Sequence, residues 1–312
     1  MVDLRVKIGD LDLANPVMPA SGAFAEGLSQ IVSFDRLGAL VTKTITAELR
    51  SGNPTPRVAE LENGMLNSIG IPSNGIDYFI AETLPFFRRF DAPLVVSISA
   101  PSADLFAALA ARVDLPGVAA IEANISCPNI EENGKAFAMR ARSTEQVVAK
   151  VRKATRLPLW AKLTPNTSDV AEVARAAEHA GADALVVANT ILAMSIDTET
   201  FRPRLGNIMG GLSGPLVKPI IVRMTYQCAK AVKIPIIGCG GVSRAEDAVE
   251  YMLAGASAVQ VGTATFVRPR AMIDVIEGLS AWCARRGVRR AAELIGAVAD
   301  GDMAVDEFEA AP

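Results

Sequence analysis

Short apolar or β-branched segments recur along the chain, and most of them are followed by the pattern of an amphipathic helix. Eight of these segments are expected to form strands: 16–19, 39–44, 94–99, 119–125, 159–163, 184–188, 235–238 and 258–262. Near-continuous hydrophobic strands that alternate with helices indicate a parallel sheet buried on both faces, and eight units indicate closure into a barrel. We therefore expect an α/β fold, a single-domain (β/α)8 TIM barrel over residues 1–298, followed by an acidic tail at 299–312.

Signals for helix starts and stops stand between the expected strands. Two capping boxes are expected, Ser143 with Gln146 and Ser243 with Glu246. Gly181 and Gly255 are expected to stop helices before the sixth and eighth strands. The regular spacing is interrupted by two long insertions rich in Gly, Pro and Asn, at 52–75 and 190–219. Both follow the carboxyl ends of strands, and long loops in a compact domain are usually functional.

Polar, cationic and glycine residues follow the expected strands directly. They are Ala20-Ser21-Gly22, Lys43-Thr44, Ser97, Asn124, Cys127, Lys162, Asn189-Thr190, Gly240-Gly241 and Gly262-Thr263. In a barrel all of these residues converge on one mouth, which is the catalytic face, and the loops after the last two strands commonly bind phosphate through backbone N–H groups. The two glycine-containing turns therefore indicate a phosphate-bearing cofactor.

Lys43 and Lys162 end strongly apolar strands. A lysine in such a place needs a partner, because an unpaired buried ammonium is unfavourable. An internal ion pair with a barrel carboxylate is one alternative. Since carboxylates are missing from the strand ends, we instead expect anionic ligands, and a phosphate cofactor plus an anionic substrate would satisfy both lysines. The same two lysines leave open the Schiff-base chemistry of a barrel aldolase.

The segment Asn124-Ile125-Ser126-Cys127-Pro128-Asn129 places a thiol among amides directly after an apolar run. Pro128 favours extended geometry at Cys127, and the amides can hold a small planar polar molecule beside the sulfur. The alternative is a free cysteine that fills space at a strand end. The single histidine, His179, lies at a helix end on the opposite, stability face, which argues against catalytic mechanisms that need an imidazole.

Charge and cysteine content exclude several classes of protein. Lys plus Arg number 31 against 34 Asp plus Glu, so the net charge of −3 gives no field for nucleic acid or an anionic membrane. The four cysteines, 127, 228, 239 and 283, are widely spaced and form no zinc or iron–sulfur motif. No signal peptide and no apolar run of ~18 residues is present. We expect a cytoplasmic protein with reduced thiols and no bound metal.

Several separated motifs resemble the class 1 dihydroorotate dehydrogenases. They are Asn124 to Asn129, Thr42-Lys43-Thr44, Gly52-Asn53-Pro54-Thr55-Pro56-Arg57, Asn67-Ser68-Ile69-Gly70 and Gly210-Gly211-Leu212-Ser213-Gly214. The resemblance runs from about Leu4 to about Leu279. The stretches 54–60, 64–67 and 207–219 look most like the catalytic subunit of the NAD-linked subclass, 1B.

This resemblance implies the FMN-dependent oxidation of dihydroorotate to orotate in pyrimidine (UMP) biosynthesis. Cys127 would be the base that takes a proton from substrate C5, while hydride passes from C6 to flavin N5. The implied FMN contacts are Ser21, Lys43, Thr44, Ser97, Asn124, Lys162, Ala188, Gly214, Gly240, Gly241, Gly262 and Thr263. The implied substrate contacts are Lys43, Asn67, Ser68, Ile69, Gly70, Ile71, Asn124, Asn129, Asn189 and Thr190. Ser97 stands where we expect an asparagine, and the stretch 71–75 departs from the wording of the subclass.

The chain has no GxGxxG motif opening a helix and no four-cysteine cluster, so electrons must leave through another protein or acceptor. Resemblance to subclass 1B implies a separate subunit that carries FAD and a 2Fe–2S cluster and reaches NAD, in a heterotetramer built on a catalytic homodimer. Three alternatives remain: a fumarate-linked homodimer of the same family, the Schiff-base aldolase, and a scaffold barrel without activity. Cys127 argues against the quinone-linked class 2 enzymes, which have serine at this place.

Overall fold

The computed structural model describes residues 2–126 and 136–299 of the chain. Its centre is an eight-stranded sheet in the order β3-β16-β15-β10-β9-β8-β7-β4, in which every neighbouring pair is parallel. The strands are β3 (Val17–Pro19), β4 (Leu40–Val41), β7 (Leu94–Ile98), β8 (Ala120–Asn124), β9 (Leu159–Lys162), β10 (Ala184–Val187), β15 (Ile236–Cys239) and β16 (Ala256–Val261). The backbone N–H of Gly38 donates to the carbonyl of Val17 at 2.8 Å, which joins the two ends of the sheet. The predicted (β/α)8 barrel is confirmed.

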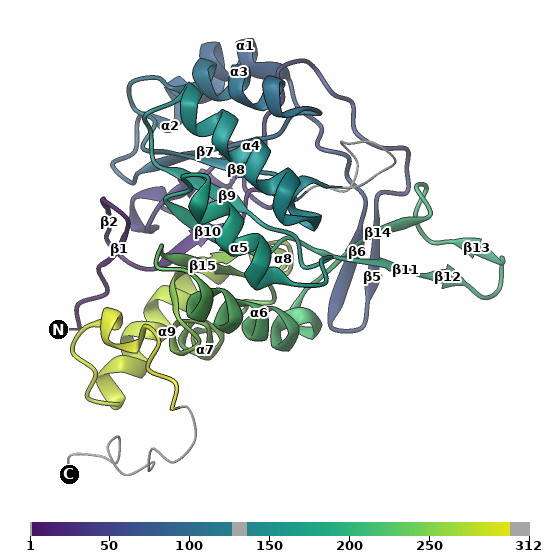
Figure 1. Ribbon diagram of the computed structural model, residues 1–312. Helices are drawn as coiled ribbons and strands as arrows, with labels where there is room; N and C mark the ends of the chain where they lie inside the picture. Colours follow the sequence, from purple (N-terminus) through teal and green to yellow (C-terminus); the bar gives the residue numbers. More distant parts are fainter. Residues whose placement is uncertain (1, 127–135, 300–312) are drawn as a thin grey trace.

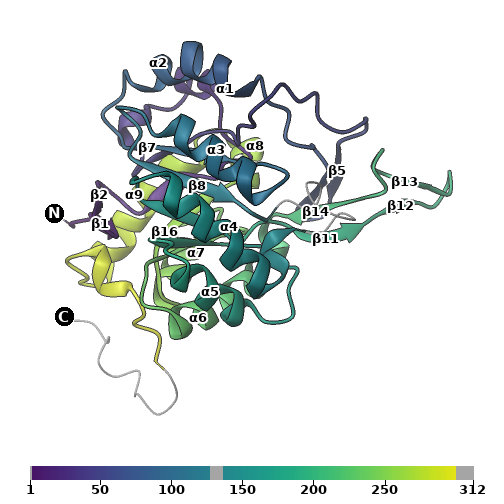
Figure 2. The same cartoon turned by 45° about the horizontal axis from the view of Figure 1, so that its top comes forward.

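Helices cover the outside of the barrel (Figure 1). They are α1 (Gly75–Tyr78), α2 (Leu84–Phe87), α3 (Ala103–Val113), α4 (Ala141–Ala154), α5 (Val170–His179), α6 (Lys218–Ala231), α7 (Ala245–Leu253), α8 (Thr263–Val267) and α9 (Ala271–Arg285). An N-terminal hairpin of β1 (Val6–Ile8) and β2 (Leu11–Leu13) lies on the side of the barrel opposite to the insertions (Figures 1 and 2). Within the described ranges, no helix is long and apolar enough to cross a membrane.

Both predicted capping boxes are wrong in detail. Helix α4 begins at Ala141, so Ser143 already lies in its first turn, and the hydroxyl donates to the carbonyl of Phe137 at 2.6 Å. At α7 the carboxylate that accepts from the N-cap N–H is Asp247 instead of Glu246, because the N-cap is one residue later than expected. The predicted helix stops are confirmed. Gly181 and Gly255 have φ of +95° and +108°, a region that glycine enters without strain.

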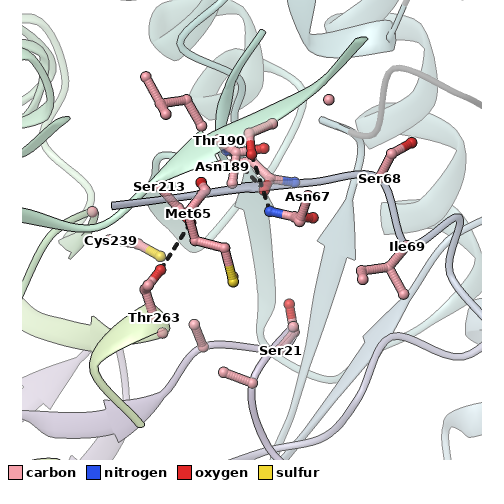
Figure 3. Close-up of a pocket in the computed structure, with 18 of the residues that line it drawn as sticks. Ser21, Met65, Asn67, Ser68, Ile69, Asn189, Thr190, Ser213, Cys239 and Thr263 are labelled. Atoms are coloured by element: carbon pink, nitrogen blue, oxygen red, sulfur yellow. Dashed lines mark hydrogen bonds between the residues drawn. The ribbon is translucent and has the colours of Figure 1, made fainter. Parts of the chain in front are cut away.

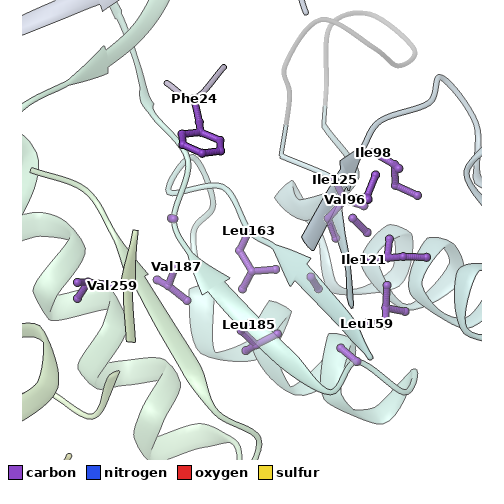
Figure 4. Close-up of a cluster of buried hydrophobic side chains, with 14 of the residues drawn as sticks. Phe24, Val96, Ile98, Ile121, Ile125, Leu159, Leu163, Leu185, Val187 and Val259 are labelled. Atoms are coloured by element: carbon purple, nitrogen blue, oxygen red, sulfur yellow. The ribbon is translucent and has the colours of Figure 1, made fainter. Parts of the chain in front are cut away.

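Alternation along the strands divides the core into two layers. Side chains such as Val96, Ile121 and Leu185 pack outward beneath the helices, as Figure 4 shows. Their neighbours in sequence, among them Val95 and Val186, fill the barrel interior together with Trp160. This division follows from the two-residue period of a strand, since both faces of a parallel barrel are buried.

The two insertions meet in a second sheet above the mouth of the barrel. The first contributes β5 (Val58–Leu61) and β6 (Gly64–Asn67), and the second contributes β11 (Ile191–Met194) and β14 (Met209–Ser213). These strands are antiparallel in the order β11-β14-β6-β5, with β14 paired to β6 across the two insertions. The second insertion continues into the hairpin β12 (Ile196–Asp197) and β13 (Arg202–Pro203), which extends away from the barrel (Figure 1).

We predict that Phe106→Ala lowers the free energy of unfolding by about 3–5 kcal/mol, because Phe106 is 1% exposed and its ring packs 5.8 Å from that of Phe137. Leu105→Ala is the matched control on the same helix, since Leu105 is 47% exposed and should change stability by no more than about 0.5 kcal/mol. Urea unfolding of the three proteins measures both effects. Equal losses for the two variants would contradict the assigned helix face.

Candidate active site

A cavity of about 940 Å³ lies between the carboxyl ends of the strands and the inserted sheet. This volume is near the upper end of the range of about 300–1,000 Å³ typical of ligand sites. Seventeen of the predicted site residues line it: Ser21, Lys43, Thr44, Asn67, Ser68, Ile69, Gly70, Ile71, Asn124, Lys162, Ala188, Asn189, Thr190, Gly240, Gly241, Gly262 and Thr263. Figure 3 shows Asn67, Asn189 and Thr190 on one side of this cavity and Ser21 on the other. Their individual roles stay predictions.

Two further predicted residues, Ser97 and Gly214, do not line the large cavity. Ser97 is fully buried and is absent from the lining; it contacts the cavity only through Thr44, whose hydroxyl is 2.9 Å from its own. Gly214 lines a smaller hollow of about 110 Å³ that shares Gly241 and Thr263 with the large cavity. Cys127 and Asn129 fall outside the described residues.

The smaller hollow lies between the turns that follow β15 and β16. Gly241 has φ +73°, and a Cβ atom there would come within 2.9 Å of the carbonyl oxygen of Gly214. The turn is held from below by Asp247, whose carboxylate accepts from the N–H and hydroxyl of Ser243, both at 2.9 Å. The strand-to-helix turn therefore keeps a concave backbone surface that a side chain would fill.

Asp247 also pairs with Lys218, whose Nζ lies 2.8 Å from Oδ1. Burial acts to raise the pKa of Asp247, but hydrogen bonds from Lys218 and Ser243 and the charge of Lys218 outweigh it, so the pKa lies below its ordinary value. Asp247 is thus a buried, charged support for the glycine turn.

Lys162 has protein partners inside the barrel. Its Nζ donates to Gln260 Oε1 at 2.9 Å and to Ser21 Oγ at 3.3 Å, and it lies 3.7 Å from Glu122 Oε1. The alternative of an internal ion pair with a barrel carboxylate, which we ranked below an anionic ligand, is therefore present at Lys162, since Glu122 is buried within β8 instead of standing at a strand end. The signal in the sequence was a carboxylate within the apolar run 119–125 and an amide within the run 258–262.

Lys43 differs from Lys162 because no hydrogen bond or ion pair joins its ammonium to any residue in the described part of the chain. It lines the cavity and is half-buried, and burial lowers the pKa of its ammonium group. An anionic group bound in the cavity would restore the favourable environment that this charge has lost. The expectation of an anionic ligand therefore stays a prediction for Lys43.

Amide side chains supply the other polar groups of the cavity. Asn67 Nδ2 donates to the carbonyl of Gly211 at 3.1 Å, which links the two insertions. Asn189 Oδ1 accepts from the N–H of Thr190 at 2.9 Å. The hydroxyl of Thr263 donates to Ser213 Oγ at 2.8 Å, and a dashed line marks this bond in Figure 3. The cavity thus combines one uncompensated cation with amide and hydroxyl groups in fixed positions.

The sequence interpretation missed several lining residues from the two insertions, among them Val58, Glu60, Met65, Leu192, Asn207 and Met209. Asn207 Nδ2 donates to Ser68 Oγ at 3.2 Å, and Asn53 Nδ2 donates to the same oxygen at 2.8 Å. Cys239 was also missed as a lining residue. Burial raises the pKa of its thiol, so it remains neutral. No local pattern could identify the lining residues from the insertions, because the pairing of β14 with β6 brings the two insertions together over the cavity.

Comparison with known proteins agrees with this geometry. A model of the family described as dihydroorotate dehydrogenase matches residues 3–282. A protein of Trichlorobacter lovleyi named dihydroorotate dehydrogenase B (NAD(+)), catalytic subunit, is 49% identical over 298 residues, which cover 95% of this chain and 98% of the relative. Proteins of the same name from Desulforamulus reducens and Bacteroides thetaiotaomicron are 49% and 44% identical over 299 and 301 residues, covering 95% and 96% of this chain and 98% and 99% of the relatives.

We predict that Asp247→Asn lowers the free energy of unfolding at neutral pH by about 2 kcal/mol, because the turn loses a charged acceptor and Lys218 loses a buried partner. The carboxylate has a lowered pKa in the folded protein, so its contribution is complete above its ordinary pKa of 3.8 and is lost as pH falls further. Urea unfolding across this pH range measures the difference.

Glu250→Gln is the matched control, since Glu250 pairs with the same Lys218 at 2.5 Å but is 45% exposed. It should change stability by no more than about 1 kcal/mol. A difference between Asp247→Asn and the parent protein that stays constant below pH 3.8 would contradict the role of the charge.

Proposed function

The chain belongs to the dihydroorotate dehydrogenase family and is a dihydroorotate dehydrogenase, and from this premise we propose that it oxidises dihydroorotate to orotate with bound FMN in the cavity at the mouth of the barrel. The observation that carries the proposal is the uncompensated ammonium of Lys43 in a cavity lined by amides and continuous with a glycine hollow. We place the reaction in pyrimidine biosynthesis in the cytoplasm.

FMN fits the residues at the barrel side of the cavity. The glycine turns at Gly240-Gly241 and Gly262-Thr263 would hold its phosphate. The lack of a side chain at Gly241 supports this assignment, because a Cβ atom there would prevent a close approach to the backbone. Ser21, Lys43, Thr44, Asn124, Lys162, Ala188 and Gly214 complete the proposed cofactor site, whereas Ser97 lies behind Thr44 and does not line the cavity. When bound, FMN supplies the acceptor for the hydride that leaves substrate C6.

Lys162 would lie beside the flavin ring. Its ammonium is held by Gln260 and Ser21 and is balanced by the carboxylate of Glu122. A fixed positive charge in a buried place stabilises negative charge that develops nearby, and it needs no rearrangement at the moment of reaction. These contacts support the proposed role of Lys162.

Dihydroorotate carries a carboxylate and a ring with carbonyl and N–H groups. Lys43 would pair with the carboxylate, and the amides of Asn67, Asn124 and Asn189 with Thr190 would match the ring groups. Residues Ser68, Ile69, Gly70, Ile71 and Asn129 complete the proposed substrate site. This assignment satisfies the charge of Lys43, which otherwise lacks a partner in the described part of the chain.

Cys127 is the proposed base, and its thiolate would take the proton from substrate C5. Its neighbour Ser126 is buried, donates to Asn124 Oδ1 at 2.8 Å and accepts from Asn189 Nδ2 at 2.9 Å. Both amides line the cavity, which supports a base that follows Ser126 directly in the chain. A cysteine can act as a base when its thiolate is favoured, as it is by nearby cations.

The printed names of the relatives describe a catalytic subunit of an NAD-linked enzyme. We propose the same arrangement here: a catalytic homodimer joined to a separate subunit that carries FAD and a 2Fe–2S cluster, in a heterotetramer. A fumarate-linked homodimer is the alternative within the family.

The first test is anaerobic addition of dihydroorotate to the purified yellow protein, followed by flavin absorbance. We expect the absorbance to bleach, and to bleach at least about a hundredfold more slowly at neutral pH in Cys127→Ser, since a hydroxyl is a far weaker acid than a thiol and general base catalysis contributes ~10²–10⁴-fold. Cys283→Ala, in helix α9, is the control and should bleach at the parent rate.

A colourless protein that takes up no FMN would contradict the cofactor assignment and favour the barrel aldolase, which borohydride would trap with its substrate on Lys43 or Lys162. A yellow protein that does not bleach would contradict the substrate assignment alone.

For the electron partner, we expect the chain bleached by dihydroorotate to stay reduced when NAD alone is added under anaerobic conditions, and to regain its absorbance when a subunit carrying FAD and a 2Fe–2S cluster is also present. Stopped-flow absorbance measures both reactions. Rapid recovery with fumarate alone would instead identify the homodimeric alternative.

A further inference from the structure

Six buried or half-buried polar side chains form a continuous line of hydrogen bonds beneath the cavity. It starts at Glu122 Oε1, which is 2.9 Å from Ser97 Oγ, and Ser97 Oγ is 2.9 Å from Thr44 Oγ1. Asn124 Nδ2 lies 3.2 Å from Thr44 Oγ1. Ser126 Oγ then lies 2.8 Å from Asn124 Oδ1 and 2.9 Å from Asn189 Nδ2. The line crosses from the barrel interior to the amides of the cavity.

Charge fixes the direction of hydrogen bonding at the interior end. The ammonium of Lys162 has only donors, so Gln260 must turn Oε1 toward it, at 2.9 Å. Gln260 Nε2 then faces Glu122 Oε2 at 2.7 Å and donates to it. An ionised carboxylate accepts only, so the Ser97 hydroxyl must also donate to Glu122. Neither the amide of Gln260 nor the hydroxyl of Ser97 has a free choice of orientation.

The direction propagates along the line because each hydroxyl has one proton. The Ser97 hydroxyl uses its one proton in the hydrogen bond to Glu122. Toward Thr44 it can therefore only accept, so Thr44 must donate to Ser97. The Thr44 oxygen therefore accepts from Asn124, which turns Nδ2 toward Thr44 and Oδ1 toward Ser126. Every bond from Asn124 to Glu122 runs toward the carboxylate.

The far end of the line gives the same direction independently. The backbone N–H of Thr190 donates to Asn189 Oδ1 at 2.9 Å, which fixes Asn189 with Nδ2 toward Ser126. Ser126 thus accepts from Asn189 and donates to Asn124, in agreement with the direction set from Glu122. The side-chain NH2 groups of Asn124 and Asn189 each donate one N–H within this line of hydrogen bonds, and each has a second N–H that the line does not use.

We propose that Glu122 and Ser97 are positioning residues that hold the amide of Asn124 with an N–H donor available to the substrate, beside Asn189, which the backbone of Thr190 orients, so that the cavity selects ligands with acceptor oxygens at these positions. The proposal rests on the proposed function, because dihydroorotate and orotate carry such oxygens on the ring and the carboxylate. Neither residue lines the cavity, and both would act through Thr44 and Asn124.

Replacing Glu122 by glutamine is expected to reverse the direction of the hydrogen bonds from Glu122 to Asn124. Lys162 would still hold Gln260, so the new amide would turn its oxygen to Gln260 and its NH2 group to Ser97. Ser97 would then accept at that side and donate to Thr44, and Asn124 would be driven to exchange its oxygen and nitrogen. The donor presented to the ligand would become an acceptor, which repels a carbonyl or carboxylate oxygen.

The test uses the dissociation constant of orotate for the FMN-loaded protein, measured by isothermal titration calorimetry. Ser97→Ala breaks the line while leaving Glu122, Gln260 and Lys162 in contact, and we expect it to weaken orotate binding about tenfold, as a misdirected hydrogen bond does. Ser99→Ala is the matched control. Ser99 lies two residues after Ser97, just beyond the end of β7, is 1% exposed and donates to the backbone carbonyl of Asn124, so binding should change by less than about twofold.

Glu122→Gln should weaken orotate binding at least as much as Ser97→Ala. A variant that combines both changes should bind orotate as tightly as Glu122→Gln alone, because both changes act through the same line of hydrogen bonds. For Ser97→Ala, the KM of dihydroorotate should rise with kcat little changed, while thermal unfolding shows Ser97→Ala and Ser99→Ala to be equally stable. Equal orotate affinities for these two serine variants, or additive losses in the double variant, would overturn the proposal. Parent protein that binds FMN but no orotate would overturn the proposed function, and with it this inference.

Discussion

A parallel barrel presents the carboxyl ends of all its strands at one rim, and the rest of this structure depends on that constraint. Both faces of each strand are buried, so polar side chains can reach solvent or a ligand only where the strands end. Ser21, Lys43, Asn124 and Asn189 meet there although they come from different units of the chain. The cavity is therefore a consequence of the topology.

The interior charges show how such a rim is supported. A carboxylate and an ammonium are stable inside an apolar barrel only if each finds an opposite charge and further hydrogen bonds. Glu122 and Lys162 meet this condition together with Gln260 and Ser97. Lys43 does not meet it within the described residues, and its pKa is lowered by burial. The paired charges organise the floor of the site, whereas the lone cation is left for a ligand.

The inserted sheet closes the other side of the cavity. Pairing of β14 with β6 brings Gly211 beside Asn67, and the hydrogen bond between Asn207 and Ser68 fastens the second insertion to the first. Because neither insertion forms this sheet alone, the substrate side of the site depends on contacts between segments far apart in the chain. A change in one insertion is therefore expected to alter the residues that the other presents.

The sequence by itself determined the eight strands, the barrel, the helix stops at Gly181 and Gly255, and the rim residues, because strand pattern and glycine turns are local signals. The sequence interpretation named Glu246 as the capping carboxylate of helix α7, where the structure has Asp247, and it did not identify Glu122 as the partner of Lys162. Only the tertiary structure decided that pairing, the inserted sheet and the direction of hydrogen bonding from Asn189 to Glu122. These features join residues on different strands, and their distances are set by closure of the barrel, which no local pattern encodes.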